Sequence, residues 1–284
     1  MNALRGIKWP YALIALVAVA AAAFGLLHPA AAAPTAAKKK KPGATARIKQ
    51  NPPPQLFTDA EIAKIGKAAA DQHRKADALF AKWKAQHGTA RDDKAFAAWA
   101  AQQVPAAPPA KQRTAELHDV QALAKTRTAA GEKAATWLEA HGKKDIWKLY
   151  LHDQRELIPA AQGKVEKAQL KAALKMAKNV SDQVAAKDKQ PAPFVMDPTL
   201  RPEKRIKPGA KGPYSYPSRH AARSAAAVTF LSALSPHRAA DYEWMRAEVL
   251  YSRLYMAGHV DSDLTAGTLL GDLIGDYELA INGH

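Results

Sequence analysis

The feature that most constrains the fold is the steady use of helix-forming residues from Thr58 to the end of the chain. This stretch is rich in Ala, Lys, Glu, Gln and Leu, and it contains few Val or Ile residues and almost no alternation of polar and apolar positions. Such a pattern favours helices, because half-buried strands need an alternating pattern and prefer β-branched residues. We therefore predict an all-α chain.

Capping signals and chain breaks divide this stretch. Thr58-Asp59-Ala60-Glu61 has the form of a capping box, and Ser235-Pro236 places an N-cap before a proline at a first helical position. The longest interruption runs from Pro191 to Pro217 and predicts a loop. We expect helices over 58–87, 92–103, 112–141, 144–158, 163–186, 220–234, 237–256 and 260–281.

The N-terminal residues have a different composition. Arg5 and Lys8 precede an uncharged apolar run over 9–27, and small residues at 30–33 follow it. We expect residues 1–33 to be a secretory signal peptide or, because about 20 apolar residues span a bilayer, an uncleaved N-terminal anchor. Either reading places the remainder outside the cytoplasm.

Residues 34–55 contain the lysine run 38–41 and the proline run 52–54. Such a composition cannot bury a core, so we expect a Lys/Pro-rich linker that stays extended and acts as a spacer, with adhesion to anionic lipid or wall polymer as the alternative. The folded domain is then expected over 56–284.

Cysteine content and charge restrict the function. The chain has no Cys, which excludes a disulfide scaffold, Cys-ligated zinc, iron–sulfur clusters and thiol catalysis. The formal net charge of +16 favours an anionic partner: nucleic acid, a membrane face or a phosphorylated substrate. Because no basic stripe is interleaved with aromatic residues, we expect no nucleic-acid partner.

The segment around His259 carries the first chemical signal. Gly258 can end one helix, and Asp261 and Asp263 belong in the first turn of the next. His259 then lies at a helix N-terminus, where free N–H groups attract an oxyanion and disfavour the imidazolium. Asp263 follows four residues later and can accept the Nδ1 proton, which leaves Nε2 free to attack phosphorus. Arg253 offers a planar fork for phosphate oxygens.

A second segment repeats this arrangement. Ser218 can cap a helix that begins at Arg219, with His220 in its first turn. Its hydroxyl can bind phosphate, and a protonated His220 can donate to the leaving alkoxide. Each segment alone is more often structural than functional, but their joint occurrence predicts a phosphoryl-transfer site that uses no metal.

The spacing of these residues resembles a known family. Ser-Arg, five residues, His, three residues and Asp over 252–263, preceded by Pro-Ser-x-His over 217–220 and by Arg201-Pro202, resembles the type 2 phosphatidic acid phosphatase and vanadium haloperoxidase superfamily. Within it the chain is most similar to the bacterial class A nonspecific acid phosphatases. The motif core covers about 194–267. The resemblance implies a single helical-bundle phosphatase domain whose active site lies at converging helix N-termini.

The resemblance also implies roles for individual residues. His259 would be the nucleophile, Asp263 its orienting partner, and His220 the general acid and later the base. Arg201, Ser218 and Arg253 would bind phosphate. Arg219 is a further candidate because of its own charge, without support from the resemblance.

Two positions depart from the family pattern. The family has Lys seven residues before the Arg of Arg-Pro, where this chain has Phe194, so the lysine is either displaced to Lys187 or Lys189 or absent. The family has Gly where this chain has Arg219, whose charge helps but whose bulk would narrow the pocket or strain the backbone. We expect these departures to slow catalysis.

The sequence thus predicts a periplasmic or secreted, metal-independent acid phosphatase that hydrolyses phosphomonoesters through a phosphohistidine, with tethering to the inner membrane as one form. The alternatives are a catalytically weakened member that binds phosphorylated ligands, and a vanadate-dependent haloperoxidase. We expect no cofactor, although phosphate or vanadate would fit the site. The expected partners are a phosphorylated small molecule and a membrane surface near the N-terminus. The substrate, signal cleavage and oligomeric state stay open.

Overall fold

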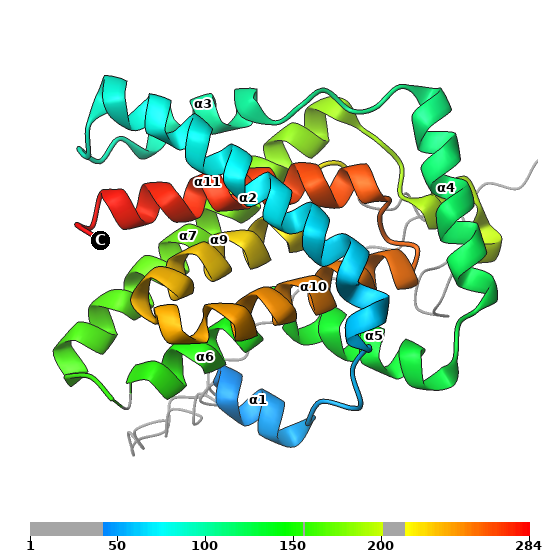
Figure 1. Cartoon of the computed structure of the whole chain (residues 1–284), viewed down its shortest axis with the longest axis horizontal. Coiled ribbons are helices and arrows are strands. Elements are labelled where there is room, and N and C mark those ends of the chain that lie inside the picture. Colours follow the sequence, from blue (N-terminus) through cyan, green and yellow to red (C-terminus); the bar gives the residue numbers. More distant parts are fainter. Residues whose placement is uncertain (1–41, 156, 201–213) are drawn as a thin grey trace, which may run out of the picture. The chain divides into compact units, whose positions relative to one another are not determined.

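The computed structural model describes residues 42–155, 157–200 and 214–284, and every regular element in these ranges is helical (Figure 1). The all-α prediction is therefore confirmed. The elements are α1 (Ala44–Gln50), α2 (Asp59–His87), α3 (Asp93–Gln103), α4 (Ala110–Lys125), α5 (Ala129–His141), α6 (Asp145–Arg155), α7 (Ala160–Asp188), α8 (Pro193–Met196), η1 (Pro198–Leu200), α9 (Arg219–Leu234), η2 (Pro236–Arg238), α10 (Ala239–Tyr255) and α11 (Asp261–Ala280).

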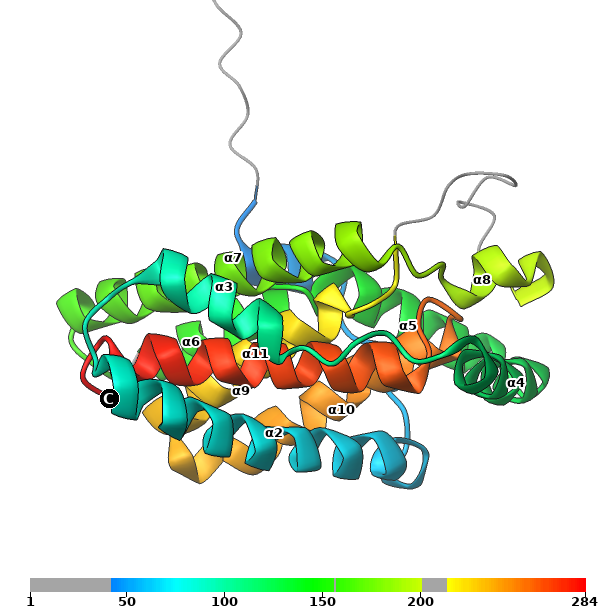
Figure 2. The same cartoon turned by 90° about the horizontal axis from the view of Figure 1, so that it is seen from above.

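Helix α11 is the central element of the bundle. It packs against α9, α2 and α7, and Figure 2 shows it between α2 on one side and α7 on the other. Most of its side chains are buried, including Leu270, Leu273 and Ile274. The expected capping box at Thr58 is present at the start of α2. Burial around α11 therefore holds the bundle together.

Three glycines on one face of α11 let it approach α9 closely. A Cβ atom at Gly267 would lie 2.4 Å from the Ser218 carbonyl oxygen, and one at Gly271 would lie 2.1 Å from the Ala222 carbonyl oxygen. At Gly275 the nearest atom would be Thr229 Cβ at 2.6 Å. Because real Cβ atoms do not come this close, the spacing of α9 and α11 requires glycine. This contact brings the N-termini of the two helices together.

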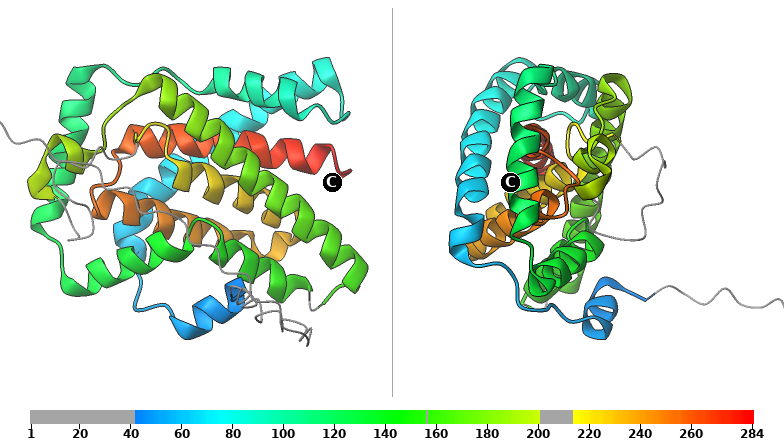
Figure 3. Two further views of the ribbon diagram at one scale, coloured as in Figure 1. Left: turned by 180° about the vertical axis from the view of Figure 1, so that it is seen from behind. Right: turned by 90° about the vertical axis from the view of Figure 1, so that its right-hand side faces the viewer.

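The expected helix over 112–141 is wrong, because the chain turns between α4 and α5. Thr128 caps α5 by accepting from the Gly131 amide at 3.1 Å, and its own amide donates to the Tyr255 hydroxyl at 2.7 Å. A Cβ at Gly131 would lie 2.2 Å from that hydroxyl. The turn therefore forms around a side chain of α10. Helix α4 crosses one end of the bundle, as the right-hand view of Figure 3 shows.

Two expected irregular segments contain helices. Within the expected extended linker, residues 44–50 form α1, which packs on α6; Ile48 is buried and Arg47 Nε donates to Asp145 at 2.7 Å. The reason is that one apolar and one charged residue of this segment find partners on the domain. The Pro191–Pro217 interruption contains the short elements α8 and η1.

The N-terminal expectations fall on residues that the structure does not describe. The expected leader over 1–33 and the lysine run 38–41 lie outside the described residues. Among the helices that are described, none combines the length and the apolar character needed to cross a bilayer.

Candidate active site

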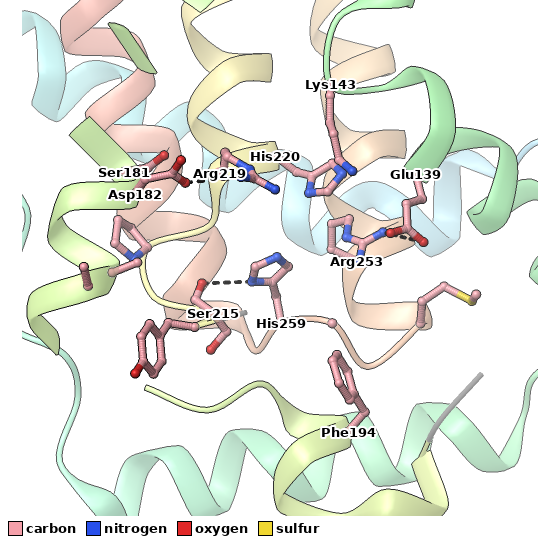
Figure 4. Close-up of a pocket in the computed structure, with 16 residues that line it drawn as sticks. Glu139, Lys143, Ser181, Asp182, Phe194, Ser215, Arg219, His220, Arg253 and His259 are labelled. Carbon is pink, nitrogen blue, oxygen red and sulfur yellow. Dashed lines mark hydrogen bonds and ion pairs between the residues drawn. The ribbon is translucent and has the colours of Figure 1, made fainter. Parts of the chain in front are cut away.

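A cavity of about 590 Å³ lies where the N-termini of α9 and α11 meet the end of α10 and the turn between α5 and α6 (Figure 4). One part of its wall is cationic or imidazole-bearing and comprises Lys143, Arg219, His220, Arg253 and His259. Another part is apolar and comprises Ala185, Ala186, Phe194, Tyr214, Pro217 and Met256. The cavity is large enough for a phosphate and an attached organic group.

The His259 ring is held between two groups of another segment. Nδ1 lies 3.0 Å from the Ser215 carbonyl oxygen, and Nε2 lies 3.2 Å from Ser218 Oγ. Because a carbonyl only accepts, Nδ1 carries the proton and Nε2 accepts from the serine hydroxyl. Burial lowers the pKa of His259, although nearby Asp263 opposes this shift. A neutral ring with a lone pair on Nε2 is the form that a nucleophile needs.

Asp263 supports His259 in a different way from the one expected. Its Oδ2 lies 3.5 Å from Nδ1, so the Ser215 carbonyl is the closer acceptor. The same Oδ2 accepts from the Val260 amide at 3.1 Å and so caps α11. Burial acts to raise the pKa of Asp263, but His259 and Arg113 outweigh it and keep this pKa below its usual value. Asp263 therefore places a buried negative charge beside the histidine.

The start of α9 supplies Ser218 and His220. Ser218 caps α9 by accepting from the Ala221 amide at 3.3 Å, as predicted, and its amide donates to the Asp263 carbonyl at 2.8 Å. The His220 and His259 ring centroids lie 6.4 Å apart. His220 Nε2 is buried and has no hydrogen-bond partner among the described residues. Burial, together with Arg253, lowers the pKa of His220 well below its usual value.

Two of the three expected arginines lie at the cavity. Arg253 is buried, and its Nη1 lies 3.6 Å from Glu139 Oε2. A Cβ at Gly258 would lie 2.5 Å from Arg253 Nη2, so the glycine allows the guanidinium to lie against the loop before His259. Arg219 lies at the rim, where its Nη1 is 3.3 Å from Asp182 Oδ1. Arg201 lies outside the described residues.

A comparison with protein-family models gives one match, to the PAP2 superfamily, over residues 177–277. The match covers less than half of the chain, and we call residues 177–277 the PAP2 segment because they are similar to that superfamily. No curated protein matches the chain. Among solved structures, the crystal structure of a transmembrane PAP2 type phosphatidylglycerolphosphate phosphatase from Bacillus subtilis is similar, with 14% identity, 66% of this chain and 92% of that chain covered, and a TM-score of 0.44. A likeness this distant carries no conclusion about substrate.

The PAP2 segment contains every expected site residue that the structure describes. It also contains the two departures. Phe194 is buried, lines the cavity and donates its amide to the Ala257 carbonyl at 3.2 Å. Lys187 lines a different cavity and Lys189 ends α7, and neither is among the residues that line this one. Arg219 begins α9 without a positive φ, so the expected backbone strain is absent.

Sequence reasoning missed residues that lie upstream of the PAP2 segment. Arg113 of α4 is buried and donates to Asp263 Oδ1 at 2.8 Å, to the Pro191 carbonyl at 3.0 Å and to Ser215 Oγ at 3.2 Å. Glu139 of α5 and Lys143 of the turn after α5 also line the cavity. No local pattern distinguishes these residues from the many other charged residues in the upstream helices.

Proposed function

We propose that this protein is an acid phosphatase that hydrolyses phosphomonoesters through a phosphohistidine at His259. The observation that carries the proposal is the orientation of His259, with Nδ1 toward a carbonyl oxygen and Nε2 toward Ser218 in a cationic cavity. The likeness of residues 177–277 to the PAP2 superfamily supports phosphatase chemistry in general. The phosphomonoester substrate and the acidic optimum are the finer part of the proposal.

In the first step Nε2 of His259 attacks the phosphorus, and the bond to the leaving oxygen breaks. Arg253 and the Ser218 hydroxyl bind the non-bridging oxygens, with Arg219 and Arg201 as further contributors. The positive charge that forms on the imidazole is stabilised by Asp263, whose lowered pKa keeps it ionised.

His220 serves both steps. Its pKa is lowered in the free protein, where Arg253 is nearby. A bound phosphate dianion offsets these cations and raises the pKa, so that His220 binds a proton and can donate it to the leaving alkoxide. The neutral His220 then takes a proton from water, which attacks the phosphohistidine and releases inorganic phosphate. This requirement for a proton favours acidic pH.

The apolar part of the wall favours certain esters. Phe194 and Met256 face the cavity, and Tyr214 is exposed at its edge. We expect aryl and alkyl phosphates to react faster than sugar phosphates, since apolar groups gain from burial here. The leader expected from the sequence over 1–33 further leads us to propose that the protein acts in the periplasm or outside the cell.

The departure at Phe194 supports a second candidate function. A buried phenyl ring in the place of the family lysine removes a cation, so the chain would bind phosphorylated ligands with little turnover. The two candidates share phosphate binding and differ in hydrolysis.

The test is hydrolysis of p-nitrophenyl phosphate by the purified chain, with and without a chelator, together with a quench in alkali and denaturant to trap a phosphoenzyme that is stable to base and labile to acid. We expect chelator-insensitive hydrolysis that His259→Ala lowers by about 10⁴-fold or more and a phosphoenzyme that this variant lacks. His237→Ala, an exposed histidine in η2, is the matched control. Hydrolysis that survives in His259→Ala overturns the mechanism, and phosphate binding without turnover favours the second candidate.

A further inference from the structure

The turn between α5 and α6 is held firmly against the cavity. The Trp147 indole N–H donates to the Gly142 carbonyl at 2.7 Å, and Trp147 is fully buried. A Cβ at Gly142 would lie 2.8 Å from Val249 Cγ2, so this turn contacts α10 through backbone. Lys143 follows directly and lines the cavity together with His220 (Figure 4). Its main chain is therefore fixed where its side chain reaches the site.

The Lys143 ammonium has the Glu139 carboxylate nearby but no direct partner among the described residues. The side chain is half-buried, and its ammonium forms no ion pair or hydrogen bond with the residues that the structure describes. Burial lowers the pKa of Lys143; Glu139 opposes this shift, and Arg253 and Arg219 add to it. A half-buried cation that lies near two arginines and only one carboxylate is stabilised when a further anion binds. His220 Nε2 lies in the same wall, is buried and has no hydrogen-bond partner among the described residues, so it is a second group that a bound ligand can satisfy.

We propose that Lys143 is a phosphate-binding residue of this cavity, supplied by the turn between α5 and α6, which lies outside the PAP2 segment. The inference rests on the proposed function for the identity of the anion. The ammonium donates to a non-bridging phosphate oxygen and offsets part of its charge. Phe194 and Lys143 both line the cavity, so Lys143 supplies a cation to a wall that has Phe194 where the family resemblance leads one to expect lysine.

The experiment measures binding of inorganic phosphate and of vanadate by calorimetry, and kcat and KM for p-nitrophenyl phosphate, in the full chain. Lys143→Met is expected to weaken phosphate binding by about 10- to 100-fold, the range of charge-assisted hydrogen bonds, and Lys143→Arg to retain most of it. Lys144→Met changes the exposed neighbour and is expected to stay within about twofold of the wild type.

The pH dependence separates contact from a structural role. Because the pKa of Lys143 is lowered, its ammonium loses its proton at a lower pH than a free lysine, whose pKa is about 10.4. Phosphate affinity in the wild type should therefore begin to fall below that pH. This fall should move to higher pH in Lys143→Arg, since arginine stays charged.

The outcomes separate the two proposals. If Lys143→Met has the same phosphate affinity and kinetics as Lys144→Met, the inference is overturned and the proposed phosphatase function stands. A wild type that binds phosphate through Lys143 but hydrolyses nothing overturns the proposed function and supports the inference. A wild type that binds neither phosphate nor vanadate overturns both.

Discussion

The PAP2 segment and the upstream helices contribute different things to the same cavity. The PAP2 segment supplies the groups that react, His259 and His220. Both lie at helix N-termini, and a hydrogen bond from the Ser218 amide to the Asp263 carbonyl joins these two helix ends. The upstream part supplies charges, through Arg113 of α4 and Lys143 of the turn after α5. One region therefore fixes the chemistry, and the other fixes the electrostatic environment in which it works.

This division is sharpest around the two acceptors near His259 Nδ1. The Ser215 carbonyl and the Asp263 carboxylate both lie close to Nδ1, and Arg113 binds Asp263 and the Ser215 hydroxyl at the same time. A residue of α4 thus positions both groups that orient a histidine almost 150 residues away. Removing it tests how far the PAP2 segment depends on the upstream helices.

The largest effect is expected for Arg113→Met. It leaves the Asp263 carboxylate buried without its cation, which costs about 3–5 kcal/mol of the free energy of unfolding. In the protein that remains folded we expect kcat for p-nitrophenyl phosphate to fall by about 10- to 100-fold, as the orientation of His259 loosens. Urea denaturation and steady-state kinetics measure the two quantities.

Two further variants keep the Arg113 test decisive if Arg113→Met does not fold. Arg113→Lys retains the charge and should recover most of the stability but less of kcat, because one ammonium cannot bind Asp263, Pro191 and Ser215 together. When Asp263 is already changed to Asn, Arg113→Met should lower the free energy of unfolding by less than it does in the wild type. Additive effects in that double variant would show that Arg113 acts independently of Asp263.

The next effect tests the packing within the PAP2 segment. Gly271→Ala places a methyl group 2.1 Å from the Ala222 carbonyl oxygen, so α9 and α11 must separate, at a cost of about 1–3 kcal/mol of the free energy of unfolding. Gly66→Ala in upstream α2 meets only Ala247 Cβ at 3.5 Å and should stabilise by about 0.5–1 kcal/mol. Thermal unfolding compares the two, and equal effects would contradict the close-packing argument.

The sequence allowed the reactive groups to be placed, because their positions depend on local signals. Ser218 before His220 marks a helix start, and Gly258 before His259 marks a helix end, so both histidines were expected near helix N-termini. The positions of Arg113 and Lys143 depend instead on where the chain turns between α4 and α5. That turn forms because Gly131 meets Tyr255 of α10, a contact between distant residues that no local pattern shows.

A third prediction concerns the contact between upstream α2 and the PAP2 segment. His73 Nδ1 of α2 lies 3.4 Å from the buried Asp272 of α11, and this carboxylate raises the pKa of His73 to about 9. Stability from this pair is fully present below the unfolded pKa near 6.5 and is lost as pH rises through about 9. His73→Gln should therefore cost about 1 kcal/mol at pH 6, after allowance for solvent exposure, and much less at pH 10.

Urea denaturation at the two pH values measures this difference, with His237→Gln as the control. A cost for His73→Gln that is the same at pH 6 and pH 10 would show that His73 acts by packing, and that charge does not join α2 to α11.

The smallest effects are expected at two carboxylates on the cavity rim, one from each region. Upstream Glu139 faces buried Arg253, and Asp182 of the PAP2 segment faces half-exposed Arg219. Each carboxylate competes with phosphate for its arginine. Exposed ion pairs contribute about 0.2–1 kcal/mol, so Glu139→Gln should tighten phosphate binding at pH 6 by about two- to fivefold. Asp182→Asn should tighten it by less than about twofold, because its pair is more exposed.

Calorimetry with inorganic phosphate compares these two variants with Asp71→Asn, which removes a carboxylate that pairs with Arg74 on α2. Weaker binding in Glu139→Gln would mean that Glu139 holds Arg253 in place. The upstream region would then position a phosphate-binding arginine of the PAP2 segment, as Arg113 positions Asp263. Tighter binding, with the larger effect at Glu139, would instead mean that the upstream helices set the net charge that the bound phosphate meets.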